Sequence, residues 1–277
     1  MTTYETHRRF YARFVAAQGE VVDAKIIEAF ATIRREQFVG PAPWHIRVSN
    51  GYLITEADDP SILYQDILIG LAPDRWINNG QPSLHAGCLG VAEPKADNIV
   101  IHVGAGTGYY SAILAYLVGQ EGKVHAYEIE PDLIARATAN LADIATVTLH
   151  PQSALEAQLP SADVIYVSAG ATHVPAVWLD ALAPGGRLVL PLTPNERFGC
   201  MLLVTRQAGE IYAARIFSTA AFIHCIGARD DEQSRALAAA LDTRSTKEVR
   251  SLRRGVEPDD TAWCVGTGWW LSTAEPN

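Results

Sequence analysis

Apolar residues recur at helical intervals near the start of the chain. Val22, Ile26 and Phe30 are separated by charged and polar residues, a pattern that predicts an amphipathic helix over residues 22–38. Prolines follow shortly after this segment and end the helix, because proline lacks the backbone N–H that a helix interior needs. Over residues 44–80 the apolar runs are short and mixed with turn-forming residues, and we expect loops and short strands there.

The middle of the chain alternates between short apolar runs and helical patterns. Strands are predicted at residues 99–103, 123–128, 147–149, 164–167 and 187–190, and helices at residues 82–92, 109–118, 131–141 and 174–182. Such alternation indicates parallel βαβ units with helices on both faces of one sheet. Two further strand patterns, residues 201–205 and 211–217, predict an antiparallel hairpin at the sheet edge. The predicted fold is therefore α/β, a doubly wound Rossmann-like sheet with an antiparallel edge hairpin.

The pattern divides the chain into three regions. We expect an N-terminal helical cap over residues 1–93, the core over residues 94–226 and a C-terminal appendage over residues 227–277. Within the appendage, residues 230–241 are predicted to form a surface helix. Residues 244–254 carry five basic residues and one acidic residue, which is typical of a solvated, mobile surface segment.

Tryptophans gather near the C-terminus. Trp263, Trp269 and Trp270 are separated by few residues, several of them glycines. We expect a docked appendage and not a free tail, because leaving three indole rings in water would forfeit much apolar burial. The alternative is that these rings form a peptide-binding surface.

Composition and charge exclude several classes of protein. The chain has 277 residues, of which 48% are hydrophobic, and this is enough to build a buried core. With 22 Lys and Arg against 31 Asp and Glu, the formal net charge is −9. An acidic chain is a poor candidate for binding nucleic acid, because phosphate contacts need clustered cations. We therefore expect no nucleic-acid partner.

Cysteine usage and hydropathy suggest a compartment. Cys88, Cys200, Cys225 and Cys264 lie far apart without a CxxC pair, so neither a zinc site nor a redox dithiol is indicated. We expect reduced, mostly buried thiols. The N-terminus has no apolar stretch of signal-peptide length, and no window approaches the ~20 apolar residues of a membrane span. A cytoplasmic protein without a membrane partner is the expectation.

A glycine-rich turn carries the first candidate chemistry. The segment Val103–Gly108 reads Val-Gly-Ala-Gly-Thr-Gly, follows a predicted strand and opens a helix. Glycines allow a sharp turn and a close approach of ligand to backbone, and the helix start offers free N–H groups. Such a turn fits NAD, FAD or S-adenosylmethionine, and it also occurs as a plain strand–helix connection.

An acidic residue narrows the choice of ligand. Glu128 ends the second predicted core strand, 24 residues after Gly104, and its carboxylate could accept both hydroxyls of an adenosine ribose. The GxGxG spacing differs from the dinucleotide GxGxxG, and the hairpin follows the fifth parallel strand. Both features favour the methyltransferase version of the doubly wound sheet.

Several segments resemble the protein-L-isoaspartate O-methyltransferases. They are Ile33–Val39 (IRREQFV), Tyr64–Asp66 (YQD), Gln81-Pro82, Val103–Tyr110 (VGAGTGYY) and Leu179–Pro191 (LDALAPGGRLVLP). The resemblance covers roughly residues 20 to 226. The glycine turn alone is generic, whereas the Arg-Glu-x-Phe-Val and Gln-Pro elements upstream are more specific. The resemblance implies S-adenosylmethionine as methyl donor and a carboxyl group of a protein or peptide as acceptor.

The sequence departs from the family pattern at three places. Before Gln-Pro the family carries Thr-Ile-Ser, whose Ser lies at the reacting carboxylate, whereas this chain has Asn78-Asn79-Gly80. The acidic residue two places before the first glycine is His102 here. The adenine-contacting Gly-Asp-Gly region is replaced by Pro151–Ser153. We therefore expect a divergent member, with Gly80 at the substrate Ser position and an acceptor that need not be isoaspartate.

The candidate site residues follow from these matches. Asn78 and Asn79 are predicted to donate hydrogen bonds to the acceptor carboxylate, with plain turn formation as the alternative. His85 lies about one helical turn after Gln81 and is predicted to face the cofactor, with a structural role as the alternative. The predicted cofactor-binding residues are Gly104, Ala105, Gly106, Gly108, Tyr109, Glu128, Ile129, Gln152, Ser153 and Ser168. No spacing of histidines suggests a metal site.

Methyl transfer to a carboxylate needs little beyond positioning. The acceptor is ionised at neutral pH, so no strong base is required, and orientation supplies most of the catalysis. The leading hypothesis is an S-adenosylmethionine-dependent carboxyl methyltransferase acting on a protein or peptide. The alternatives are a small-molecule O- or N-methyltransferase and a non-catalytic S-adenosylmethionine-binding protein. The sequence leaves the oligomeric state open.

Overall fold

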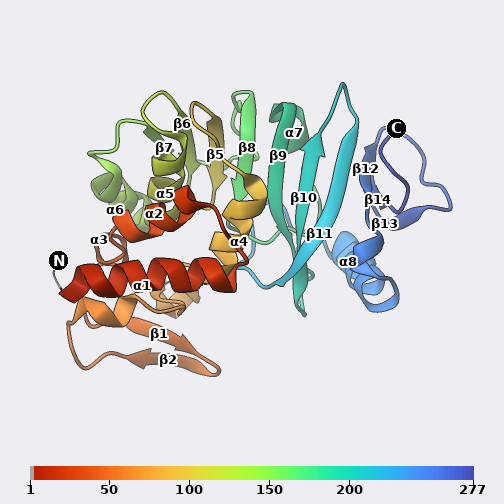
Figure 1. Cartoon of the computed structure of the whole chain (residues 1–277). Helices are drawn as coiled ribbons and strands as arrows, with labels where there is room; N and C mark the ends of the chain where they lie inside the picture. Colours follow the sequence, from red (N-terminus) through yellow and green to blue (C-terminus); the bar gives the residue numbers. More distant parts are fainter. Residues whose placement is uncertain (1–2) are drawn as a thin grey trace. The chain divides into compact units, whose positions relative to one another are not determined.

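The computed structural model describes residues 3–277 and divides into two compact units (Figure 1). The first unit combines the residues up to Asn98 with Ala105–Gln152. The second unit combines Ile99–Gly104 with Ser153–Asn277.

The first unit is mostly helical. Its helices are α1 (Thr3–Gln18), α2 (Ala24–Thr32), α3 (Glu36–Val39), α4 (Pro82–Ala92), α5 (Tyr109–Val118) and α6 (Pro131–Leu141), with 3₁₀ turns η1 (Pro60–Leu63) and η2 (Pro73–Arg75). Its strands form three pairs. Two pairs are antiparallel: β1 (His45–Val48) with β2 (Gly51–Ile54), and β3 (Gly70–Ala72) with β4 (Ile77–Asn78). The third pair is β6 (Lys123–Tyr127) with β7 (Val147–His150). The last pair is parallel, as the sequence predicts.

The predicted helix over residues 22–38 is two helices. The chain leaves the helical conformation at Ile33, which caps α2 with an extended backbone, and α3 follows. Arg35 lies in the break, fully buried, and its guanidinium donates to the carbonyls of Leu63 and Ile67. The long-range contacts of this one side chain therefore override the helical periodicity. Helix α1 is not among the elements predicted from the sequence.

The second unit contains most of the large sheet. Its elements are β5 (Ile99–Val103), β8 (Ala162–Val167), α7 (Ala176–Ala181), β9 (Leu182–Leu192), β10 (Gly199–Arg206), β11 (Tyr212–Ala220), α8 (Asp231–Thr243), η3 (Thr246–Glu248), β12 (Ser251–Arg254), β13 (Ala262–Gly266) and β14 (Trp269–Ser272). Within this unit the strand order is β13-β14-β12-β11-β10-β9-β8-β5. Strands β5, β8 and β9 are parallel, and the strands from β9 onward pair antiparallel. The predicted α/β fold with an antiparallel hairpin is confirmed.

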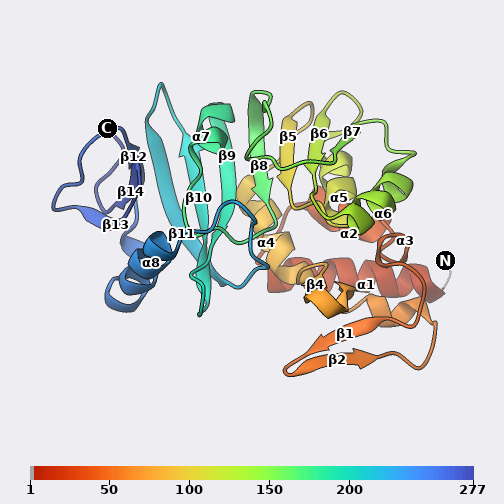
Figure 2. The ribbon, with the colours of Figure 1, turned by 180° about the vertical axis from the view of Figure 1, so that it is seen from behind.

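The C-terminal region extends the sheet beyond the hairpin. Residues 244–254, predicted as a mobile surface segment, instead contain η3 and β12, with Val249, Ser251 and Leu252 buried. Buried Val249, Ser251 and Leu252 lie among the charged residues of this segment, and a count of charges does not detect them. Figures 1 and 2 both show α8 beside β13 in this region.

The tryptophans of the appendage are packing residues. Trp263, Trp269 and Trp270 are all buried, which confirms the docked appendage. Each indole N–H donates to a protein oxygen: to the Ser245 carbonyl, the Gln233 side chain and the Val256 carbonyl respectively. With their rings buried and their N–H groups satisfied, the three tryptophans hold the appendage together.

The four cysteines are all buried and form no disulfide within the described residues, as predicted. Burial raises the pKa of Cys200 to about 12, so its thiol stays protonated and unreactive. In the described part of the chain, no helix has the length and apolar character required to cross a membrane.

Candidate active site

The glycine turn follows β5 and leads into α5. Gly104, Gly106 and Gly108 have φ values of +76°, +58° and +95°, in the left-handed region that other residues enter only with strain. A Cβ on Gly108 would lie 2.8 Å from the Leu141 side chain, whereas a Cβ on Gly106 would make only ordinary contact with Leu71, at 3.5 Å. Backbone conformation favours glycine at both positions, and packing against Leu141 excludes a larger residue at position 108 as well.

The carboxylate of Glu128 fastens this turn to the end of β6. Its Oε2 accepts a hydrogen bond from the Gly106 N–H at 2.7 Å, and its Oε1 accepts from the N–H groups of Ile129 and Glu130 at 2.8 and 3.0 Å. Glu128 is 7% exposed, and burial raises the pKa of its carboxyl against the opposing effect of these three bonds. A carboxylate has about four acceptor positions, so one position on Oε2 remains for a ligand hydroxyl. The sequence predicts that Glu128 accepts hydrogen bonds from both ribose hydroxyls, whereas these three bonds leave room for one.

The other predicted cofactor residues of the first unit contribute in different ways. The Tyr109 ring is buried against Phe38, so only its backbone is available to a ligand. The Ile129 side chain is 39% exposed beside the turn and offers an apolar surface. Gln152 follows β7, and its N–H donates to the His150 carbonyl, which leaves the Gln152 side chain to reach a ligand.

In the second unit, Ser168 follows β8 and is held by His102 of β5. The His102 Nε2 and Ser168 Oγ atoms lie 3.0 Å apart, and the Ser168 N–H donates to the Val103 carbonyl. Burial lowers the pKa of His102 to about 3, so the imidazole is neutral at physiological pH. A neutral imidazole thus occupies the family's acidic position and orients a hydroxyl. Ser153 is engaged locally, since its Oγ accepts from the Leu155 N–H at 3.2 Å.

Asn78 and Asn79 lie in the turn between β4 and α4 with different surroundings. Asn78 Oδ1 accepts a hydrogen bond from the Gly80 N–H at 2.9 Å, the geometry of an Asx turn. Asn79 is 8% exposed, and its Oδ1 accepts from the Ile69 N–H at 2.9 Å and from Arg35 at 3.4 Å. These bonds fix the orientation of the Asn79 amide. Its Nδ2 is buried and has no hydrogen-bond partner within residues 3–277.

His85 and Gly80 depend on each other. The His85 ring is buried and stacks on Tyr110, with ring centroids 3.6 Å apart and planes at 14°. Gly80 has a φ of +73°, and a Cβ there would lie 2.3 Å from His85 Nε2. The family's Ser is therefore missing for a steric reason, because the imidazole of His85 occupies the space next to that position.

Two side chains that support this turn were not identified from the sequence. Asp66 accepts hydrogen bonds from the Ser83 N–H at 2.8 Å, from Ser83 Oγ at 2.6 Å and from Gln81 Nε2 at 3.0 Å, and so caps the start of α4. Arg35 holds the Asn79 amide from the other side. Both lie in the segments that resemble the family, but only tertiary contacts reveal their roles.

The loop after β8 is largely structural at its start. A Cβ on Gly170 would lie 2.2 Å from Thr193 Oγ1, and Thr172 Oγ1 accepts from the Asp230 N–H. Arg229 adds bonds to the carbonyls of Gly170 and Thr193. His173 is partly exposed, whereas Gly170 and Thr172 are buried.

Comparisons with known proteins identify the family of this chain. The family model for "Protein-L-isoaspartate(D-aspartate) O-methyltransferase (PCMT)" matches residues 12–229. Protein-L-isoaspartate O-methyltransferase 1 of Arabidopsis thaliana is 32% identical over 157 residues, which span 52% of this chain and 66% of that relative.

Solved structures show the same fold. A protein-L-isoaspartate O-methyltransferase superposes with a TM-score of 0.67 at 24% identity, over 79% of this chain and 66% of that one. A Plasmodium falciparum protein in complex with S-adenosyl-L-homocysteine superposes with a TM-score of 0.61 at 16% identity, over 78% and 97%. The family-model match includes the glycine turn, Glu128 and the Asn78–Gly80 segment, and this chain belongs to the protein-L-isoaspartate(D-aspartate) O-methyltransferase family.

Proposed function

We propose that this chain transfers the methyl group of S-adenosylmethionine to a carboxylate of a protein or peptide, with isoaspartate as the first acceptor to test. Family membership makes the chain an S-adenosylmethionine-dependent methyltransferase. The observation that carries the acceptor proposal is the Asn79 amide, whose buried Nδ2 has a fixed direction and no partner in the described chain.

The residues around the glycine turn fit the adenosyl donor. Gly104, Gly106 and Gly108 have left-handed backbones and no side chains, and Glu128 keeps one acceptor position for a ribose hydroxyl. Within the first unit, Ile129 and Gln152 would lie against the adenine. Ser153 and Ser168 remain cofactor residues predicted from the sequence. The donor supplies an activated methyl group on its sulfonium.

The acceptor segment lies next to this turn within the first unit. Leu71 of β3 approaches the Gly106 position at 3.5 Å, and β3 pairs with β4, which carries Asn78. A carboxylate reaching the turn would therefore pass Asn79. A buried amide donor binds a carboxylate oxygen strongly, since such charge-assisted bonds exceed neutral ones.

The chemistry asks this chain for orientation rather than for acid–base catalysis. An ionised carboxylate is already nucleophilic, so the residues need only align it and limit water. Asn79 aligns one oxygen, and the buried ring of His85 closes the pocket where the family has its Ser. Buried cysteines without a disulfide in the described residues suit a reducing compartment, and we place the reaction in the cytoplasm.

The test is methyl transfer from labelled S-adenosylmethionine to an isoaspartyl peptide. A carboxyl methyl ester releases methanol in mild base, whereas a methyl ether or methylamine does not. We expect base-labile label for the wild type, and for Asn79→Ala a kcat at least tenfold lower with unchanged donor affinity by calorimetry. Base-stable label on a small molecule would support the small-molecule alternative, and donor binding without any transfer would support the non-catalytic one.

A further inference from the structure

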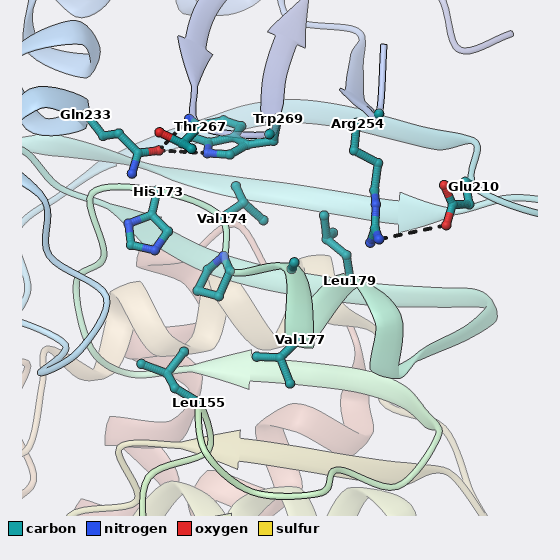
Figure 3. Close-up of a pocket in the computed structure, with 14 residues that line it drawn as sticks. Leu155, His173, Val174, Val177, Leu179, Glu210, Gln233, Arg254, Thr267 and Trp269 are labelled. Atoms are coloured by element: carbon teal, nitrogen blue, oxygen red, sulfur yellow. Dashed lines mark hydrogen bonds and ion pairs between the residues drawn. The ribbon is translucent and has the colours of Figure 1, made fainter.

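A pocket of about 650 Å³ lies in the second unit (Figure 3). Its floor is apolar and includes Leu155, Val174, Val177 and Leu179. Its opposite wall comes from the appendage, where Gln233 of α8 and Trp269 of β14 line it. The family match ends at residue 229, so this wall is an addition to the family core.

The amide of Gln233 has a fixed orientation. Its Oε1 accepts hydrogen bonds from the Thr267 N–H and from Trp269 Nε1, both at 3.0 Å. A Cβ on Gly266 would lie 2.6 Å from this oxygen, so glycine is needed beside it. The Nε2 group must therefore point away from these donors, and Figure 3 shows it directed toward His173.

His173 completes a polar pair at this end of the pocket. It is partly buried, and burial lowers the pKa of its imidazole, so the ring is neutral at neutral pH and carries one N–H and one bare nitrogen. His173 Nδ1 lies 3.4 Å from Thr172 Oγ1, so Nε2 is the ring nitrogen left for a ligand. With Nδ1 protonated, Nε2 is an acceptor, and the Gln233 NH₂ group supplies the donors. A peptide bond has the matching carbonyl and N–H.

The charges in the pocket are already paired. Arg254 bonds Asp180 at 2.6 Å and lies 3.8 Å from Glu210, both on the rim side of the pocket. No guanidinium is left without a carboxylate here, so the pocket has no surplus positive charge for a phosphate or carboxylate ligand. An uncharged segment with an apolar side chain fits better.

The pocket is also continuous with the loop after β8. Ser168, which the sequence predicts to bind the cofactor, begins this loop at the carboxyl end of β8, and His173 follows five residues later. Five extended residues reach at most about 18 Å. A substrate chain that follows this loop would bring into the pocket a residue within about five positions of the methylated one.

We infer that this pocket binds an extended, uncharged segment of the polypeptide substrate, with one apolar side chain on its floor and its backbone held by Gln233 and His173. The inference rests on the proposed function, because it takes the acceptor to be part of a polypeptide. Binding energy gathered here would lower KM and leave the methyl-transfer step unchanged.

The experiment uses isoaspartyl peptides of Ala, Gly and Ser in which a single Leu is moved through the five positions on each side. Gln233→Glu keeps the acceptor for Trp269 and Thr267 but removes the NH₂ donor, and Val177→Asp puts a charge on the floor. Val265→Asp is the matched control, because Val265 is 44% exposed on β13 and lies outside the pocket.

For the wild type, we expect one Leu position to lower KM at least tenfold at constant kcat. Both pocket variants should lose this advantage while methylating the Leu-free peptide as the wild type does, and the control should keep it. A Leu advantage that survives in both pocket variants, or is absent from the wild type, would overturn the inference.

If the wild type methylates no peptide, the proposed function fails and the pocket is tested by binding alone. The same peptides, with aspartate in place of isoaspartate, are then titrated into the full chain by calorimetry. Leu-dependent binding that Gln233→Glu abolishes supports the pocket. Absence of Leu-dependent binding at millimolar peptide overturns it.

Discussion

At the residue scale, Gly80 and His85 explain why the chain departs from its family. The sequence alone indicates only that a hydroxyl is missing before Gln-Pro. The structure shows an imidazole nitrogen 2.3 Å from where the Cβ of a serine would be, so a serine at position 80 would collide with the His85 ring. Restoring the hydroxyl therefore requires moving His85 as well.

We predict that Gly80→Ser alone lowers the free energy of unfolding by about 1–3 kcal/mol, from left-handed strain and the collision with His85. Adding His85→Ala should remove the collision, so the double variant should be more stable than the sum of the two single effects. Urea unfolding of the four proteins measures this coupling. Additive effects would show that the two residues do not touch.

Glu128 is the residue whose protonation should control donor binding. Burial raises the pKa of this carboxyl, and only its ionised form can accept bonds from the turn and from a ribose hydroxyl together. Affinity for S-adenosylhomocysteine should therefore fall as the pH drops through this raised pKa, up to tenfold per pH unit, beginning above the ordinary Glu value of about 4.3.

Calorimetry between pH 5 and 8 follows that fall. Glu130 adds to the raised pKa of Glu128 through its negative charge, so Glu130→Gln should move the midpoint to lower pH. Glu128→Gln should bind weakly without the pH step. A wild-type affinity that is flat down to pH 5, or the same midpoint in Glu130→Gln, would contradict this role.

At the element scale, local signals predict the core well and long-range contacts account for the differences. Helices α4, α5 and α6 match their predicted bounds, because proline starts α4 and α6 and glycines flank α5. The break between α2 and α3 depends on Arg35, whose partners lie about 30 residues away. The spacing of the sequence predicts the glycine turn and singles out Glu128. The orientation of the Asn79 amide depends on the hydrogen bond from the Ile69 N–H to Asn79 Oδ1, a tertiary contact that the sequence pattern does not reveal.

The turn between β5 and α5 supports a comparison of two glycines. Gly108→Ala should cost more stability than Gly106→Ala, roughly 2–4 against 1–2 kcal/mol, because only the former adds a collision with Leu141 to the left-handed strain. Gly106→Ala should instead weaken donor binding, since its methyl group lies on the ligand side. Equal losses in urea unfolding would show that packing against α6 does not select glycine at position 108.

At the scale of the whole molecule, the appendage belongs to the structure of the second unit and is not a detachable tail. Strand β12 pairs with β11, and Trp263, Trp269 and Trp270 are buried. A tryptophan buries roughly 150–250 Å², at about 25 cal/mol per Å² of apolar surface, so the three rings represent several kcal/mol.

Removing residues 231–277 should therefore lower the melting temperature by more than about 10 °C or make the chain aggregate, since β11 would become an exposed edge. The matched control is deletion of residues 275–277, which lie beyond β14. Differential scanning fluorimetry compares the two deletions. An unchanged melting temperature for the long deletion would mean that the sheet is stable without the strands beyond β11. The pocket formed by α8 and β14 would then make no contribution to the stability of the core.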